Sequence, residues 1–141
     1  ERVGVWKGAD VISDYGHHPS AIKQTIGAAR EFFPGRRIVL CYQPHQHNRT
    51  KKLFNEFVDT LLLADHLVLV EIYDVAGRNE EHDVSSKDLV EAIRSNDPAK
   101  DVQFAETFDI AESQLRDLVA INDVVLIMGA GDIDDLARRL V

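Results

Sequence analysis

Hydrophobic positions follow two alternating patterns along the 141 residues. Short runs that are almost entirely apolar are each followed by a longer stretch in which apolar residues recur every three or four positions. Because a strand covered on both faces has no polar side, the runs predict buried strands of a parallel sheet. These predicted strands are residues 37–42, 66–72, 102–105 and 123–128.

The stretches between the runs have the spacing of helices with one buried face. Pro19 suits the first position of a helix, where its missing N–H costs nothing. Ser85 is a candidate N-cap, and Asp109 with Glu112 resembles a capping box. The predicted helices are residues 19–33, 49–63, 85–95, 109–120 and 132–140.

The order of elements predicts the fold class. Two further short strands, 3–6 and 10–13, flank the Lys7-Gly8 turn, and strand then alternates with helix to the end of the chain. This order predicts a single α/β domain of three layers, Rossmann-like, with a mostly parallel sheet of about six strands and helices on both faces.

Composition narrows the class of protein. The net charge of −8 argues against a general nucleic-acid-binding role, which needs a basic face. We therefore expect no nucleic acid as a partner. No apolar run approaches the ~18–20 residues that span a bilayer, so we also expect no membrane as a partner. The single cysteine, Cys41, lies in an apolar run, which predicts a buried thiol and a cytoplasmic protein. Because the chain begins at Glu1 without a methionine, we expect it to be part of a longer protein.

Three polar clusters follow predicted strands. They are Asp14-Tyr15-Gly16-His17-His18-Pro19, Gln43-Pro44-His45-Gln46-His47-Asn48-Arg49-Thr50 and Gly129-Ala130-Gly131-Asp132. Ligands of parallel sheets bind beyond the carboxyl ends of the strands, so we expect the three clusters to meet in one site. A fourth, weaker candidate group is Tyr73, Asp74 and Arg78.

The chemistry of these clusters leaves alternatives open. Four histidines in two clusters allow a zinc site, but no HExxH or cysteine-based spacing is present, so we expect no metal. The Gly129–Gly131 turn could offer N–H groups to a phosphate or let a strand and helix pack closely. Nearby Asp132, Asp134 and Asp135 would repel a phosphate and favour the packing role. No GxxxxGK[ST] motif occurs, so the chain has no P-loop of its own.

Arg49 is the strongest candidate for binding an anion. A guanidinium forms a planar, bidentate pair with a carboxylate or phosphate. A cation at the start of a helix opposes the helix dipole, which indicates that an anion shares the site. The alternative is a solvated arginine at a helix start.

Together these motifs resemble the C-terminal domain of Mur ligases. The matching residues are Asp14-Tyr15-Gly16-His17-His18-Pro19 before a helix, Tyr42-Gln43-Pro44-His45 with Arg49-Thr50, and Gly129-Ala130-Gly131-Asp132-Ile133. The resemblance covers essentially the whole chain. It is strongest to the branch that joins L-alanine to UDP-N-acetylmuramate in peptidoglycan synthesis. The tripeptide ligase branch is similar but usually carries Phe-Ala in place of Tyr15-Gly16.

The resemblance implies a three-domain, ATP-dependent amide ligase of the bacterial cytoplasm. The first domain binds the UDP-sugar, the central domain holds most of the ATP and Mg²⁺ contacts, and the last domain closes over both. The muramyl carboxylate becomes an acyl phosphate, which the amine of alanine attacks to give an amide, ADP and phosphate. Residues 1–141 would be the closing domain, without a bound cofactor and inactive alone.

The resemblance also implies roles for individual residues. Asp14 and Tyr15 serve the nucleotide and the closed state, and Arg49 holds the alanine carboxylate. His17, His45 and Gln46 complete the amino-acid site, and the supporting residues are Gly16, His18, Gly129 and Gly131. No residue is assigned as catalytic.

One run departs from the family pattern. Where Mur ligases of this branch carry His-Arg-Tyr-Thr-Arg, this chain has His45-Gln46-His47-Asn48-Arg49. Losing the cation at Gln46 would weaken carboxylate binding by ~1.5–3 kcal/mol if that bond is charge-assisted. Either His47 compensates or the amino acid is not alanine, so amino-acid specificity stays open. The remaining alternatives are the tripeptide ligase, a free-standing Rossmann-like binding module without catalysis and, more distantly, a metal hydrolase.

Overall fold

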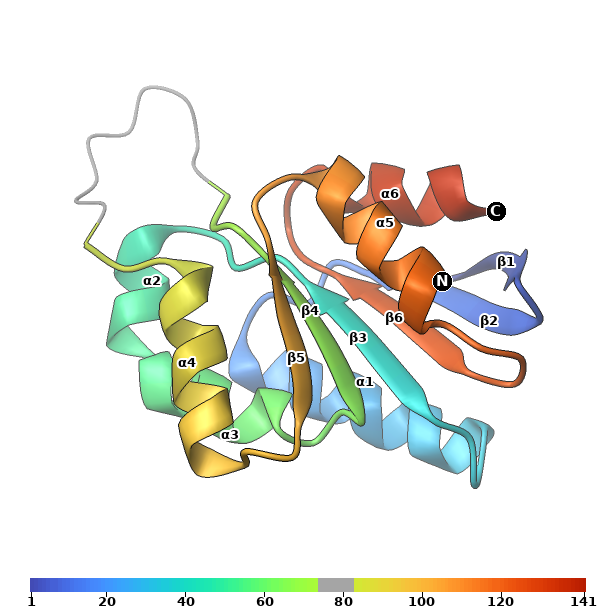
Figure 1. The fold of residues 1–141 in the computed structure, drawn as a ribbon, viewed down its shortest axis with the longest axis horizontal. Coiled ribbons are helices and arrows are strands. Elements are labelled where there is room, and N and C mark those ends of the chain that lie inside the picture. The colour runs from blue at the N-terminus through green and yellow to red at the C-terminus, as the bar shows by residue number, and fades with distance from the viewer. Residues whose placement is uncertain (74–82) are drawn as a thin grey trace.

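The structure, a computed structural model, describes residues 1–73 and 83–141 (Figure 1). Its strands are β1 (Arg2–Trp6), β2 (Ala9–Asp14), β3 (Ile38–Tyr42), β4 (His66–Val70), β5 (Asp101–Ala105) and β6 (Val124–Met128). Its helices are α1 (Pro19–Phe32), α2 (His47–Lys52), α3 (Phe54–Leu61), α4 (Ser86–Asn96), α5 (Phe108–Leu118) and α6 (Ile133–Leu140).

The described strands form one sheet in the order β1-β2-β6-β3-β4-β5. Only β1 runs antiparallel, paired with β2, and every other neighbouring pair is parallel. Strands β3 and β6 are buried at every position, as their continuous apolar runs predict. The α/β class and the mostly parallel six-stranded sheet are therefore confirmed.

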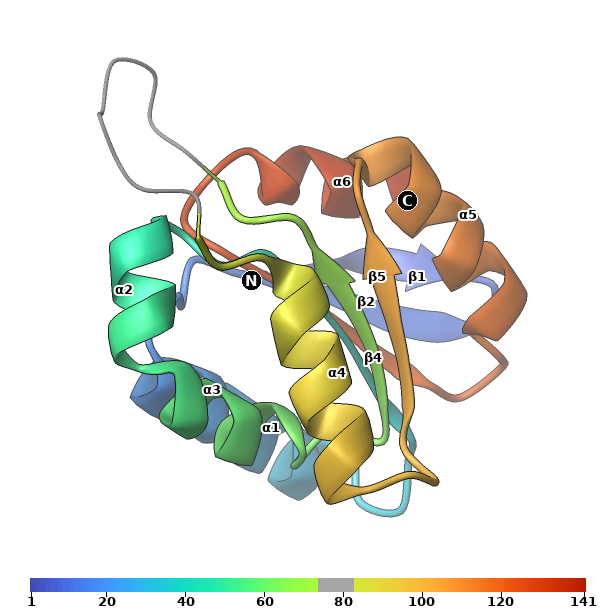
Figure 2. The same ribbon diagram turned by 60° about the vertical axis from the view of Figure 1, so that its left-hand side comes forward.

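Helices cover both faces of the sheet. Helices α1, α3 and α4 lie on one face and α5 and α6 on the other (Figures 1 and 2). Each face has its own apolar core, with Ile22, Leu40 and Leu126 in the first. The second contains Val39 and Leu115. Burying both faces gives the three layers that the pattern predicts.

The single helix expected over residues 49–63 was a wrong prediction. The chain forms two helices, α2 and α3, separated by Leu53, whose φ of −104° and ψ of 20° depart from helical values. Figure 2 shows the two helices running in different directions. The apolar stripe continues through the break, so periodicity alone does not reveal it. Helix α2 also begins at His47, two residues before the expected helix start at residue 49.

The helix caps follow the local sequence with one exception. Ser85 caps α4 in a capping box completed by Asp88, which confirms the prediction. Helix α5 is instead capped by Thr107, whose side chain accepts a hydrogen bond from the N–H of Ile110, so the Asp109 capping box is wrong.

Two further expectations concern the core and the membrane. Cys41 is completely buried, and burial raises the pKa of its thiol to about 12, so the predicted core thiol is confirmed. Across residues 1–73 and 83–141, no helix combines the length and apolar character needed to cross a bilayer.

Candidate functional site

The polar clusters meet at the carboxyl edge of the sheet. Asp14 and Tyr42, the last residues of β2 and β3, are both in register with Met128, the last residue of β6. The turns that follow β2, β3 and β6, called here the first, second and third corners, therefore lie side by side at the same level of the sheet. A bridge between His45 and Tyr73 continues the β3–β4 pairing beyond the strands.

Asp14 shapes the first corner through both of its carboxylate oxygens. Oδ1 accepts a hydrogen bond from the Gly16 N–H, and Oδ2 accepts one from the Thr25 hydroxyl, each at 2.8 Å. Gly16 fits because a Cβ there would lie 2.9 Å from the Met128 methyl. The carboxylate thus joins the turn after β2 to the middle of α1.

The other residues of the first corner differ in what they offer a ligand. Tyr15 is 67% exposed at the edge. His18 is the N-cap of α1, because its Nδ1 accepts a hydrogen bond from the Ser20 N–H at 3.3 Å. The hydroxyl of Tyr42 donates to the carbonyl of His17 at 2.9 Å. His18 therefore caps a helix, whereas the carbonyl of His17 is held by the side chain of the last residue of β3.

The second corner is built mainly by main-chain bonds. Gln43 is buried, and its amide Nε2 donates to the Glu71 carbonyl at 3.1 Å. Gln46 has a φ of +72°, in the left-handed region that non-glycine residues seldom occupy. Its N–H donates to the Tyr73 carbonyl, and its carbonyl accepts the Thr50 hydroxyl at 2.9 Å. Gln46 thus bends the chain into α2 and precedes the helix without a side-chain cap.

Three aromatic rings connect the corners. His45 lies edge-on to His17, with 6.0 Å between ring centroids and 61° between planes. On another side His45 stacks on Tyr73 at 5.2 Å and 17°. The predicted amino-acid-binding histidines, His17 and His45, are therefore neighbours.

Arg49 adds a positive charge to this edge. It lies in α2, is partly exposed, and forms no ion pair with any residue in the part of the chain that the structure describes. Burial raises the pKa of the Tyr42 phenol well above its ordinary value, and the charge of Arg49 opposes that rise. A partly exposed guanidinium that forms no ion pair with the described residues can bind an anion.

The third corner is tightly packed. Gly129 has a φ of +156°, and a Cβ there would lie 3.0 Å from the Gln43 carbonyl oxygen. A Cβ on Gly131 would lie 2.9 Å from the Tyr73 ring. Asp132 precedes α6 without a side-chain capping bond. These contacts support the packing role of the glycines, since both approach a neighbouring corner closely.

No group of three or more histidine, cysteine or acidic side chains that could hold a metal occurs within residues 1–73 and 83–141. Asp74 and Arg78, part of the weaker fourth candidate, lie outside the described residues.

The contacts of three contributors could not be read from the sequence. Thr25 is one ordinary polar residue in a helical pattern, and nothing in the sequence pairs it with Asp14. Tyr42 could have been suspected, because its hydroxyl is the only oxygen-bearing side chain in an otherwise apolar run. Tyr73 belongs to the weaker fourth candidate group, but its contact with Gly131 depends on how β4 and β6 are placed in the sheet.

Comparisons with known proteins agree with this architecture. The family model of the Mur ligase glutamate ligase domain matches residues 1–131. The UDP-N-acetylmuramate–L-alanine ligase of Nitrosomonas eutropha is 46% identical over 130 residues, which are 92% of this chain and 27% of that protein. The corresponding ligase of Dichelobacter nodosus is 40% identical over 132 residues, covering 94% of this chain and 27% of the relative.

Solved structures show the same fold. UDP-N-acetylmuramate-alanine ligase MurC from Thermotoga maritima matches with a TM-score of 0.74 and 30% identity, covering 95% of this chain and 26% of that one. A domain of a putative diaminopimelate-containing tripeptide ligase from Haemophilus ducreyi has a TM-score of 0.72 at 24% identity and covers 99% of this chain and 94% of that one.

The chain spans about a quarter of the length of the curated relatives it matches. The family model covers nearly all of it, and the sheet, its corners and the solved structures agree. The resemblance drawn from the corner motifs is thereby confirmed: this chain belongs to the Mur ligase family, whose glutamate ligase domain it contains.

Proposed function

We propose that this chain is the closing, C-terminal domain of an ATP-dependent ligase that joins L-alanine to UDP-N-acetylmuramate. The observation that carries the proposal concerns Arg49, which forms no ion pair with the described residues and lies in α2, the helix that directly follows the loop carrying His45. The names of the relatives at 40–46% identity support the substrates.

Arg49 would bind the carboxylate of the amino acid through a bidentate charge-assisted pair. His45 and His17 would line the same site, and Gln46 would offer an amide where other members of this branch have an arginine. With the carboxylate fixed, the amine is presented to the activated muramyl carboxylate in one orientation. Asp14 and Tyr15 would face the nucleotide, and closure of the domain would exclude water from the reacting groups.

ATP and Mg²⁺ would be held mainly by the parts of the longer protein outside this chain. Asp14 uses both carboxylate oxygens to hold the Gly16 N–H and the Thr25 hydroxyl, so we assign it no Mg²⁺. The turn at Gly131 is followed by Asp132, Asp134 and Asp135, whose charges disfavour a phosphate. We therefore assign no nucleotide phosphate to this turn and expect residues 1–141 alone to be inactive. We place the complete protein in the bacterial cytoplasm.

A tripeptide ligase is the second candidate, since Gln46 interrupts the run that would bind the amino-acid carboxylate. The test is ADP release by the complete native protein with ATP, Mg²⁺ and UDP-N-acetylmuramate, comparing L-alanine with L-alanyl-γ-D-glutamyl-diaminopimelate. Turnover that depends on alanine supports the proposal. Turnover with the tripeptide alone selects the second candidate, and a complete protein that ligates neither would indicate a binding module.

A further inference from the structure

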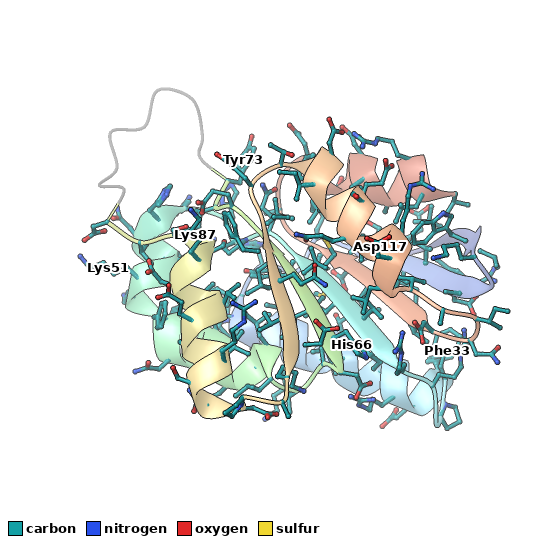
Figure 3. The ribbon with its side chains drawn as sticks, in the orientation of Figure 1. Phe33, Lys51, His66, Tyr73, Lys87 and Asp117 are labelled. Carbon is teal, nitrogen blue, oxygen red and sulfur yellow. The ribbon has the colours of Figure 1, made fainter. Side chains whose placement is uncertain are left out.

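Tyr73 lies at the carboxyl edge of the sheet, just beyond β4 (Figure 3). Its main chain is fixed by the second corner on both sides. The Tyr73 N–H donates to the Pro44 carbonyl at 2.8 Å, and its carbonyl accepts the Gln46 N–H at 3.0 Å. The position of this residue is therefore set by the loop that carries the proposed amino-acid site.

The ring of Tyr73 contacts two corners at once. It stacks on His45 with 5.2 Å between centroids, within the range of stacked aromatic pairs. It also packs on Gly131 so closely that a Cβ there would meet Cδ2 at 2.9 Å. A movement of the ring toward Gly131 would therefore require the turn after β6 to move as well.

We propose that Tyr73 is a positioning residue of the amino-acid site, an inference that rests on the function proposed above. The torsion that orients an imidazole is broad. Stacking on the Tyr73 ring restricts the orientation of the His45 ring, which is also in contact with His17. Its hydroxyl forms no hydrogen bond with the residues that the structure describes, so the ring and not the hydroxyl does the positioning.

The kinetic test uses the complete native protein with Tyr73→Ala and Tyr73→Phe. We expect Tyr73→Ala to raise the KM for the amino acid about tenfold while the KM for ATP changes less than about twofold. Tyr73→Phe, which keeps the ring, restores the amino-acid KM. Gly131→Ala, which displaces the ring, has the same effect as Tyr73→Ala. Phe32→Ala is the control, because Phe32 is an exposed aromatic residue at the far end of α1.

A second measurement follows the histidines directly by NMR of the imidazole C–H groups, assigned with His45→Asn and His17→Asn. We expect Tyr73→Ala to shift the His45 and His17 signals, and Tyr73→Phe to leave them near their wild-type positions. This result supports positioning even if the wild-type protein does not ligate alanine, an outcome that would overturn only the proposed function.

Three results would overturn the role of Tyr73. The first is unchanged histidine signals in Tyr73→Ala. The second is equal impairment by Tyr73→Ala and Tyr73→Phe, which would assign the effect to the hydroxyl. The third is a parallel rise in both KM values together with a lower unfolding midpoint, which would indicate a purely structural role.

Discussion

The hydroxyl of Thr25 donates a hydrogen bond to Oδ2 of Asp14 across 2.8 Å. Asp14 ends β2 and Thr25 lies in the middle of α1, so this bond joins a strand end to the helix that follows it. The other oxygen of Asp14 holds the Gly16 N–H. One carboxylate therefore sets both the shape of the first corner and its attachment to α1.

Removing the Thr25 hydroxyl is expected to loosen this corner. Thr25→Val keeps the shape of the side chain but leaves Asp14 one donor short, which should lower the free energy of unfolding by about 1 kcal/mol. Thr25→Ser, which retains the hydroxyl, is the matched variant. Urea unfolding monitored by circular dichroism measures both. Equal stability of the valine and serine variants would show that the bond contributes nothing.

The ion pair between Arg37 and Asp123 stabilises the opposite edge of the sheet. Nε and Nη2 of Arg37 contact the two oxygens of Asp123 at 2.9 and 2.6 Å. Asp123 is 3% exposed and also accepts the Ala120 N–H. Asp123 raises the pKa of Arg37, which burial alone would lower.

We expect Asp123→Asn to lower the free energy of unfolding by about 2 kcal/mol, because a neutral amide replaces a charged acceptor of these bonds. Asp117→Asn is the surface control and should change stability by less than about 0.5 kcal/mol. Figure 3 shows Asp117 on α5, and it is exposed. Thermal or urea unfolding that cannot distinguish the two variants would contradict this assignment.

Glu71 makes stability depend on pH. Burial disfavours its ionised form, but hydrogen bonds from the Ser85 hydroxyl and from the N–H groups of Ser86 and Ile72 outweigh burial, so the pKa of Glu71 lies below its ordinary value of 4.5. A carboxyl with a lowered pKa in the folded state stabilises the fold above its unfolded pKa and loses that contribution as pH falls through the folded value.

Glu71→Gln should therefore be less stable than the wild type at pH 7, by about 1–2 kcal/mol. The difference should shrink as the pH is lowered below about 4.5. Urea midpoints of both proteins between pH 3 and 7 give the result. A difference that is constant across this range would mean that ionisation of Glu71 does not couple to folding.

Much of the fold could be predicted because its signals are local. Continuous apolar runs predict the buried strands, and the alternation of strands with helices predicts the parallel sheet. The break at Leu53 and the cap at Thr107 could not be predicted in this way. Leu53 continues the apolar stripe through the break. Thr107 competes with Asp109, which has equally suitable capping chemistry two residues later.

Part of the candidate site could likewise be predicted from the sequence, and part of it could not. Parallel topology brings strand ends together, so the meeting of the corners could be expected from the order of elements. Contacts between corners depend on register and could not. The stack of His45 on Tyr73 and the contact of Tyr73 with Gly131 join residues from three separate strand ends.

The central claim is that Arg49 binds the carboxylate of the amino acid substrate. The most direct test compares Arg49→Ala with Lys52→Ala, an exposed cation of the same helix, in the complete native protein. Losing a charge-assisted bond worth ~1.5–3 kcal/mol should raise the KM for L-alanine about ten- to a hundredfold, while the KM for ATP stays near the wild-type value. Lys52→Ala should behave as the wild type. An unchanged KM for alanine in Arg49→Ala would contradict the assignment of this edge as the amino-acid site.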